Sequence, residues 1–176
     1  MNLLNCLPLL ALCACPLAAA QSTVRVDLNG SIQAGTCTTA AVTKTMPAVK
    51  ASAFPQTAAG KAGVAASYTP FDVALTGCSG VTGANFVFGA AADAEPQQTD
   101  SFRNKATNGA PFTAIWVRET AACSTGATVR PGATLSKTFA TATYTLPMCA
   151  QYYKFAGGLV SMGPLTTTFT VTVTYR

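Results

Sequence analysis

Apolar and polar residues alternate with a period of two along much of the chain. The clearest example is the C-terminus, where threonines at the even positions from 166 to 174 alternate with larger apolar residues. These apolar residues are Leu165, Phe169, Val171, Val173 and Tyr175. A period of two places the two sets on opposite faces of a strand. Because β-branched threonine suits a solvated sheet face, the pattern predicts a strand with one buried face.

The same alternation recurs in short segments separated by Gly- and Pro-rich stretches. The segments are 24–32, 71–75, 86–88, 112–117, 144–146 and 153–155, and the breakers are 77–83, 108–111, 130–132 and 157–164. Segment 112–117 is apolar at almost every position, which predicts a central strand. Segment 40–67 lacks a period and is expected to be a loop with a short strand or one helical turn. Short strands with such breakers predict an all-β sandwich or barrel.

The first twenty residues have the pattern of a secretory signal. Residues 3–17 are almost wholly apolar but too short to span a bilayer, which needs about 20 apolar residues. Ala18, Ala19 and Ala20 supply small residues before a cleavage site, although no Lys or Arg precedes the apolar stretch. Cleavage after Ala20 is therefore expected, with lipid attachment at Cys15 as the alternative.

Composition removes several function classes. The chain has no His and only six Asp and Glu residues, which excludes His-dependent nucleophilic catalysis and His-containing zinc sites. Its one acidic cluster, Asp93, Glu95 and Asp100, lies in a predicted loop and is interpreted as a solvated surface. The net charge of +5 comes without a Lys/Arg cluster. No enzyme activity, cofactor, metal site or nucleic-acid partner is expected.

Four cysteines remain after the predicted signal: Cys37, Cys78, Cys123 and Cys149. In an oxidising compartment they are expected to form two disulfides, and the residues alone leave all three pairings open. No CxxC spacing occurs among them, which disfavours a redox or zinc motif. Sequential pairing would close loops of 41 and 26 residues, and the chain-entropy model gives roughly 3.5–4 kcal/mol of stabilisation for each.

Four motifs stand out between residue 24 and residue 176. They are Val-Asp-Leu-Asn-Gly-Ser-Ile at 26–32 ahead of Cys37, Phe-Asp-Val-Ala-Leu-Thr-Gly-Cys at 71–78, Leu-Pro-Met-Cys-Ala-Gln-Tyr at 146–152, and Gly163 with the penultimate Tyr175. In the order and spacing of these motifs, the chain from about residue 24 to residue 176 resembles the type 1-like pilin subunits of the chaperone–usher pathway. Three features depart from the family pattern. Gln151 replaces the usual Arg, Cys123 and Cys149 are additional, and residues 108–112 replace a Gly-containing approach to the central strand.

The resemblance implies an incomplete immunoglobulin-like β-sandwich that lacks its last strand and carries an N-terminal donor-strand extension. The domains would be a signal peptide at 1–20, the donor extension at 21–33 and a pilin domain at 34–176. It also implies a Cys37–Cys78 disulfide. We further predict a Cys123–Cys149 disulfide, with two free buried thiols as the alternative.

Each such subunit accepts one strand and donates another. The expected donor residues are Val24, Val26, Leu28, Gly30 and Ile32, with Gly30 at a small position. The expected acceptor groove and chaperone contact comprise Gly163, Phe169, Val171, Val173 and Tyr175. The implied partners are neighbouring pilin subunits, a periplasmic chaperone and an outer-membrane usher.

The sequence thus predicts a structural subunit of a fimbria, exported through the periplasm to the bacterial surface and supporting adhesion. Two alternatives stay open. One is a minor, tip-adaptor or adhesin subunit of the same pilus. The other is a secreted, monomeric β-sandwich that works as a binding module, although the single tryptophan, Trp116, falls in a strand predicted to be buried.

Overall fold

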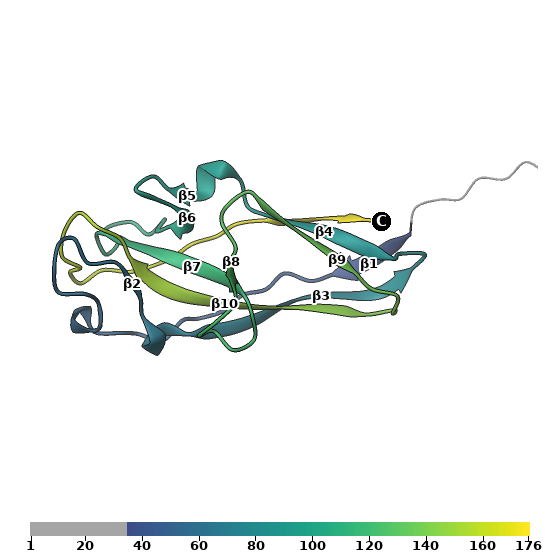
Figure 1. Ribbon diagram of the computed structural model, residues 1–176, viewed down its shortest axis with the longest axis horizontal. Coiled ribbons are helices and arrows are strands. Elements are labelled where there is room, and N and C mark those ends of the chain that lie inside the picture. The colour runs from purple at the N-terminus through teal and green to yellow at the C-terminus, as the bar shows by residue number, and fades with distance from the viewer. Residues whose placement is uncertain (1–34) are drawn as a thin grey trace, which may run out of the picture. The chain divides into compact units, whose positions relative to one another are not determined.

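The computed structural model describes residues 35–176 as strands, turns and loops. The signal segment at 1–20, the alternative lipidation site at Cys15 and the donor positions between Val24 and Ile32 lie outside the described residues. Within 35–176 the chain forms two antiparallel sheets, and its helical elements are three short 3₁₀ turns (Figure 1). These turns are Ala51–Ala53, Ala65–Ser67 and Ala91–Asp93. The all-β prediction is confirmed.

The larger sheet has eight strands. Its main path runs β1-β3-β10-β7-β6-β5, while β2 pairs with β10 and β8 pairs with β7. The bounds are β1 Thr36–Thr39, β2 Ala62–Gly63, β3 Thr69–Ser79, β5 Ala94–Glu95, β6 Gln98–Arg103, β7 Thr113–Glu119, β8 Ala127–Thr128 and β10 Tyr144–Lys154. β7 lies between β10 and β6, so the expectation of a central strand there is confirmed.

The smaller sheet has three strands in the order β11-β4-β9. They are β4 Gly83–Phe88, β9 Ala133–Thr138 and the C-terminal β11 Val171–Tyr175. Figure 1 shows β11, in yellow, running beside β4 toward the C-terminus. β11 is therefore an edge strand of this sheet among the described residues.

The core lies between the two sheets and follows the alternation of the sequence. In β3, Val73 and Leu75 are buried while Asp72 and Ala74 are exposed. The other large residues of this layer come from β4, β6, β7 and β10. They include Phe86, Phe88, Phe102, Ile115, Val117, Leu146 and Met148. Burial of these side chains is the main force that holds the sheets together.

Two disulfides join elements far apart in sequence. Cys37 in β1 is bonded to Cys78 in β3, with Cα atoms 4.2 Å apart. Cys123, in the loop after β7, is bonded to Cys149 in β10, with Cα atoms 5.2 Å apart. Both pairings match those expected from the sequence, and the alternative of two free thiols at Cys123 and Cys149 is not what the structure contains.

The C-terminal strand is shorter than its alternating pattern suggests. The pattern starts at Leu165, whereas β11 starts at Val171. The reason is that its partner β4 ends at Phe88 and turns away at Gly89, whose φ is +63°. Residues 165–170 keep the alternation of half-buried and exposed side chains without a strand partner.

Candidate strand-binding groove

An elongated groove opens between the two sheets beside β11. One wall is the C-terminal stretch 165–173, and the other is segment 39–46, which starts at the last residue of β1. The groove has a volume of about 870 Å³. Its floor is formed by core-facing residues of β3, β7 and β10, namely Phe71, Val73, Ile115, Val117, Ala150 and Tyr152. The open space is thus an extension of the hydrophobic core toward solvent.

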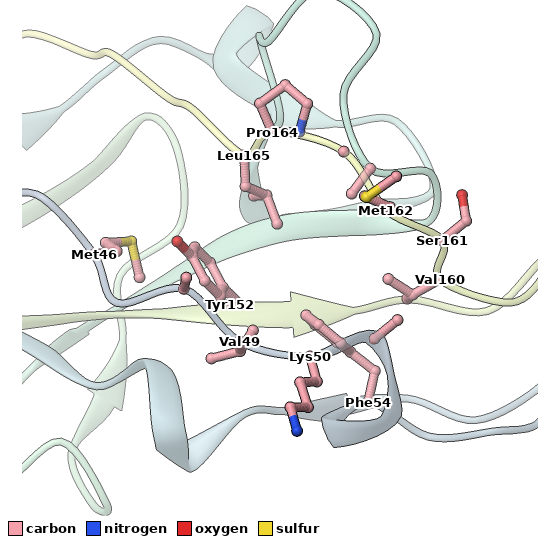
Figure 2. A pocket seen from close by; sticks show the side chains of 14 residues that line it. Met46, Val49, Lys50, Phe54, Tyr152, Val160, Ser161, Met162, Pro164 and Leu165 are labelled. Atoms are coloured by element: carbon pink, nitrogen blue, oxygen red, sulfur yellow. The ribbon is translucent and has the colours of Figure 1, made fainter.

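A second hollow of about 550 Å³ continues the groove at the end where the C-terminal stretch begins. The two spaces share Met46, Tyr152 and Leu165. Figure 2 shows the ring of Tyr152 at the centre of this hollow, with Leu165 pointing toward it from the C-terminal stretch and Phe54 approaching from the other side. Burial raises the pKa of the Tyr152 phenol above its ordinary value, so this ring stays neutral.

The backbone of the C-terminal stretch has one satisfied edge and one open edge. The Gly89 amide donates to the carbonyl of Thr170 (2.8 Å), and the Thr82 amide donates to the carbonyl of Arg176 (2.7 Å). Even-numbered residues therefore direct their backbone groups toward β4. Because successive residues of a strand point to opposite edges, the odd-numbered residues direct theirs toward the groove. No backbone–backbone hydrogen bond satisfies that edge among the described residues.

Two residues extend the satisfied edge beyond the end of β4. Lys105 donates from its backbone amide to the Thr166 carbonyl (2.7 Å) and from its side-chain Nζ to the Thr168 carbonyl (2.5 Å). Asn104 donates to the Pro164 carbonyl (3.0 Å) and accepts from the Thr166 amide (3.1 Å). Residues 164–168 are thereby held extended although no strand pairs with them. We call Asn104 and Lys105 the loop clamp.

The Lys105 ammonium also contacts the Asp93 carboxylate, at 2.7 Å. This hydrogen bond, together with one from the Ala90 amide, lowers the pKa of Asp93 below its ordinary value of 3.8. Asp93 was expected to be part of a merely solvated acidic cluster. The structure instead places its carboxylate where it orients the clamp.

The odd-numbered side chains of the C-terminal stretch line the groove. Phe169, Val171 and Val173 lie along the main space, and the Phe169 ring stacks on Phe102 with centroids 4.2 Å apart. They are only half-buried, unlike the core residues behind them. Half-buried apolar side chains next to unsatisfied backbone groups make this edge ready to pair with another strand.

The remaining predicted acceptor residues mark the two ends. Gly163 lines the end hollow, and a Cβ on it would stand 2.5 Å from the Ala110 amide nitrogen, so only glycine fits this approach. Tyr175 lies at the opposite end, where its hydroxyl donates to the Cys37 carbonyl (3.1 Å).

The facing wall, segment 39–46, is largely exposed, and Val42 is 45% exposed. Among the described residues, no backbone–backbone hydrogen bond ties residues 40–49 to another segment. Both walls therefore offer open backbone groups. The alternation of the sequence singled out the odd-numbered residues of the C-terminal stretch, but it indicated neither this second wall nor the loop clamp, because neither carries a periodic signal.

Comparison with known proteins gives a fold but no close relative. No family model matches the chain, and no curated protein matches it. Among solved structures, a chaperone–usher pilus studied for rod uncoiling matches with a TM-score of 0.59 and 17% identity, over 90% of this chain and 99% of that one. The P pilus rod subunit PapA matches with a TM-score of 0.59 and 17% identity, over 80% of this chain and 99% of that one.

The described domain has the fold of a pilus rod subunit. The immunoglobulin-like sandwich expected from the sequence is thus confirmed, and the groove lies within a pilin fold. Between residues 35 and 176, no group of three or more Cys, Asp or Glu side chains is placed to hold a metal ion. The same residues contain no helix long and apolar enough to cross a bilayer.

Proposed function

We propose that this chain is a structural subunit of a chaperone–usher pilus, which polymerises when each subunit accepts a strand from the next. The observation that carries the proposal is the groove beside β11, where open backbone groups and half-buried apolar side chains occur together. A strand inserted there would complete the backbone ladder and cover the apolar floor in one step.

The occupant we propose is the N-terminal segment 24–32 of a neighbouring subunit. Its even-numbered residues are apolar or small, as a strand that presents every second side chain to the groove requires. Since each chain would then carry one donor segment and one acceptor groove, contacts repeat head to tail and give a filament. The role is structural and involves no catalytic step.

The same groove would be filled before assembly by a strand lent by a periplasmic chaperone, and an outer-membrane usher would exchange it for the donor. This route requires the export signal proposed for residues 1–20 and places the product on the cell surface. An apolar groove left open is an aggregation hazard, which is the physical reason for such a chaperone.

A monomeric sugar-binding module is the less favoured reading, because the aromatic residue that it needs is not displayed. Trp116 is half-buried, its ring lies 4.8 Å from that of Tyr153, and the Arg118 guanidinium covers it at 4.4 Å. The Arg118 guanidinium therefore occupies a face of the ring on which a sugar would stack. A minor or tip-adaptor role would use the same groove, and locating the protein along the fibre by immunogold labelling distinguishes it from a shaft role.

The test compares two variants with the same change in net charge. Val26→Asp with Leu28→Asp places carboxylates on the inward face of the donor, whereas Arg25→Asp changes its outward face. We expect the inward variant to form the chaperone complex but no fibres, and the outward variant to assemble normally, as seen by electron microscopy of cells with chaperone and usher. Normal fibres from the inward variant would overturn the proposal.

A further inference from the structure

Among the odd-numbered residues of the C-terminal stretch that line the groove, one side chain is polar. Thr167 stands at an odd-numbered position between Leu165 and Phe169, and it lines the groove with them. Its hydroxyl oxygen is buried and has no hydrogen-bond partner among the described residues. Such a group is normally paired, so its partner is expected to come from whatever fills the groove.

We infer that Thr167 fixes the register of the incoming strand by bonding its hydroxyl to the donor backbone at Gly30 of a second copy. This inference rests on the proposed function. Gly30 is the one inward donor position without a Cβ, so it alone lets the hydroxyl reach the main chain. A donor carbonyl that already accepts a ladder hydrogen bond keeps a second lone pair for the threonine.

The pairing of Gly30 with Thr167 also matches every other inward position when the strands run antiparallel. It sets Ile32 opposite Leu165 and Leu28 opposite Phe169. Val26 and Val24 then face Val171 and Val173. Each apolar donor residue thus meets an apolar residue of the wall, and Ile32 lies next to the end hollow that Leu165 borders. If the donor strand shifted by two residues in either direction, the side chain of Leu28 or Ile32 would lie opposite Thr167. The Thr167 hydroxyl would then have no hydrogen-bond partner.

Chain length indicates that this donor comes from another molecule. The body begins beside the Tyr175 end of the groove, because Cys37 bonds Tyr175. Ile32 opposite Leu165 would have to lie about 33 Å from that end at ~3.3 Å per residue. The five residues from Ile32 to Cys37 span at most about 18 Å. The chain's own segment could therefore enter the groove only parallel to β11. In that orientation, with Ile32 near Val171, Leu28 and not Gly30 would lie opposite Thr167, and the hydroxyl would stay unpaired.

The experiment uses the full chain carrying Val26→Asp and Leu28→Asp, so that its own donor does not compete. Synthetic peptides of residues 21–34 are titrated against it: the natural sequence, Gly30→Ala, and one in which Leu28 and Gly30 are exchanged. Each titration is repeated with Thr167→Val, Thr167→Ser and Thr172→Val in the chain. Thr172 is an exposed threonine of β11 whose side chain is not among those that line the groove, and it serves as the matched control.

We expect Thr167→Val to weaken binding of the natural peptide by about tenfold, while Thr167→Ser and Thr172→Val bind as the parent does. The ratio of the two affinities, natural over exchanged peptide, should be smaller for Thr167→Val than for the parent. This is because the hydroxyl that recognises the glycine position is no longer present. A spin label at peptide residue 21 should broaden the amide signals of Val173 and Tyr175 and spare Leu165.

Failure of the inference and failure of the proposed function give different results. If no peptide binds, the groove does not accept this segment and the proposed function fails with it. If the peptides bind but Thr167→Val discriminates among them as the parent does, the role of Thr167 alone is overturned. Broadening at Leu165 in place of Val173 would overturn the antiparallel register.

Discussion

The hydroxyl of Tyr175 donates a hydrogen bond to the backbone carbonyl of Cys37, 3.1 Å away. Tyr175 belongs to the three-stranded sheet and Cys37 to the eight-stranded sheet, so this bond ties the two sheets together at one end of the groove. Cys37 is in turn held by its disulfide to Cys78. The groove is therefore closed at the C-terminal end of β11 and open along its length.

Removing this tie should loosen the closed end. We expect Tyr175→Phe to lower the free energy of unfolding by about 1 kcal/mol, because it leaves the Cys37 carbonyl without its partner while the ring stays in place. Urea unfolding of the chain with and without the donor peptide measures the effect. Thr174→Ala, at an exposed position next to it, is the control and should change little. Equal stability of Tyr175→Phe and the parent would show that the bond contributes nothing.

Gly89 should tolerate no side chain. Its φ of +63° and a Cβ that would stand 2.8 Å from Asp93 Oδ2 and 3.3 Å from Phe169 Cβ give two separate penalties. Gly77 has a similar φ of +60° and open space around it. Gly77→Ala should therefore cost about 1 kcal/mol for the backbone alone, and Gly89→Ala should cost more. Paired urea melts test the difference, and equal costs would contradict the close approach.

The contact between Asp93 and Lys105 predicts a loss of stability in acid. The pKa of Asp93 is lowered in the folded state, so its contribution is present above the unfolded value of 3.8 and is lost as the pH falls through the folded pKa. Asp93→Asn should be less stable than the parent at pH 6, and the gap should narrow below pH 3.8. Urea unfolding from pH 6 to pH 2.5 measures it, and a gap that is constant with pH would contradict the assignment.

The second disulfide should contribute to stability without being needed for strand uptake. Cys123 and Cys149 lie outside the set of residues that line the groove. Replacing both with Ala should lower the free energy of unfolding by roughly 2–4 kcal/mol. Peptide binding at 10 °C should stay within about twofold of the parent, because the groove walls are untouched. Loss of peptide binding by a folded double variant would show that the disulfide shapes the groove.

Strands whose packing follows a simple alternation were predictable from the sequence. Val73 and Leu75 in β3, like Phe86 and Phe88 in β4, point to the core as their spacing of two requires. The central place of β7 followed from its apolar residues on both faces. In each case the information is local, because the side-chain period is a property of one strand.

The loop clamp was not predictable in this way. Asn104 and Lys105 are two polar residues after a strand, and nothing near them in the sequence indicates that they bind carbonyls about sixty residues later. The same holds for Asp93, whose partner Lys105 follows a different strand. Long-range polar contacts depend on how the sheets are stacked, and no period in the sequence records that.

Odd- and even-numbered residues between 164 and 176 have separate roles. The odd-numbered side chains face the groove, and even-numbered carbonyls accept hydrogen bonds from the rest of the domain. Inserting one residue between Pro164 and Val171 would turn threonines into the groove and turn carbonyls away from Asn104 and Lys105, so both the body and its docking edge would be damaged. Inserting two residues would keep the odd-numbered side chains facing the groove and the even-numbered carbonyls facing the rest of the domain. It would only shift the end of the groove that lies next to Leu165. Tolerance to length changes here is thus expected to depend on parity rather than on size.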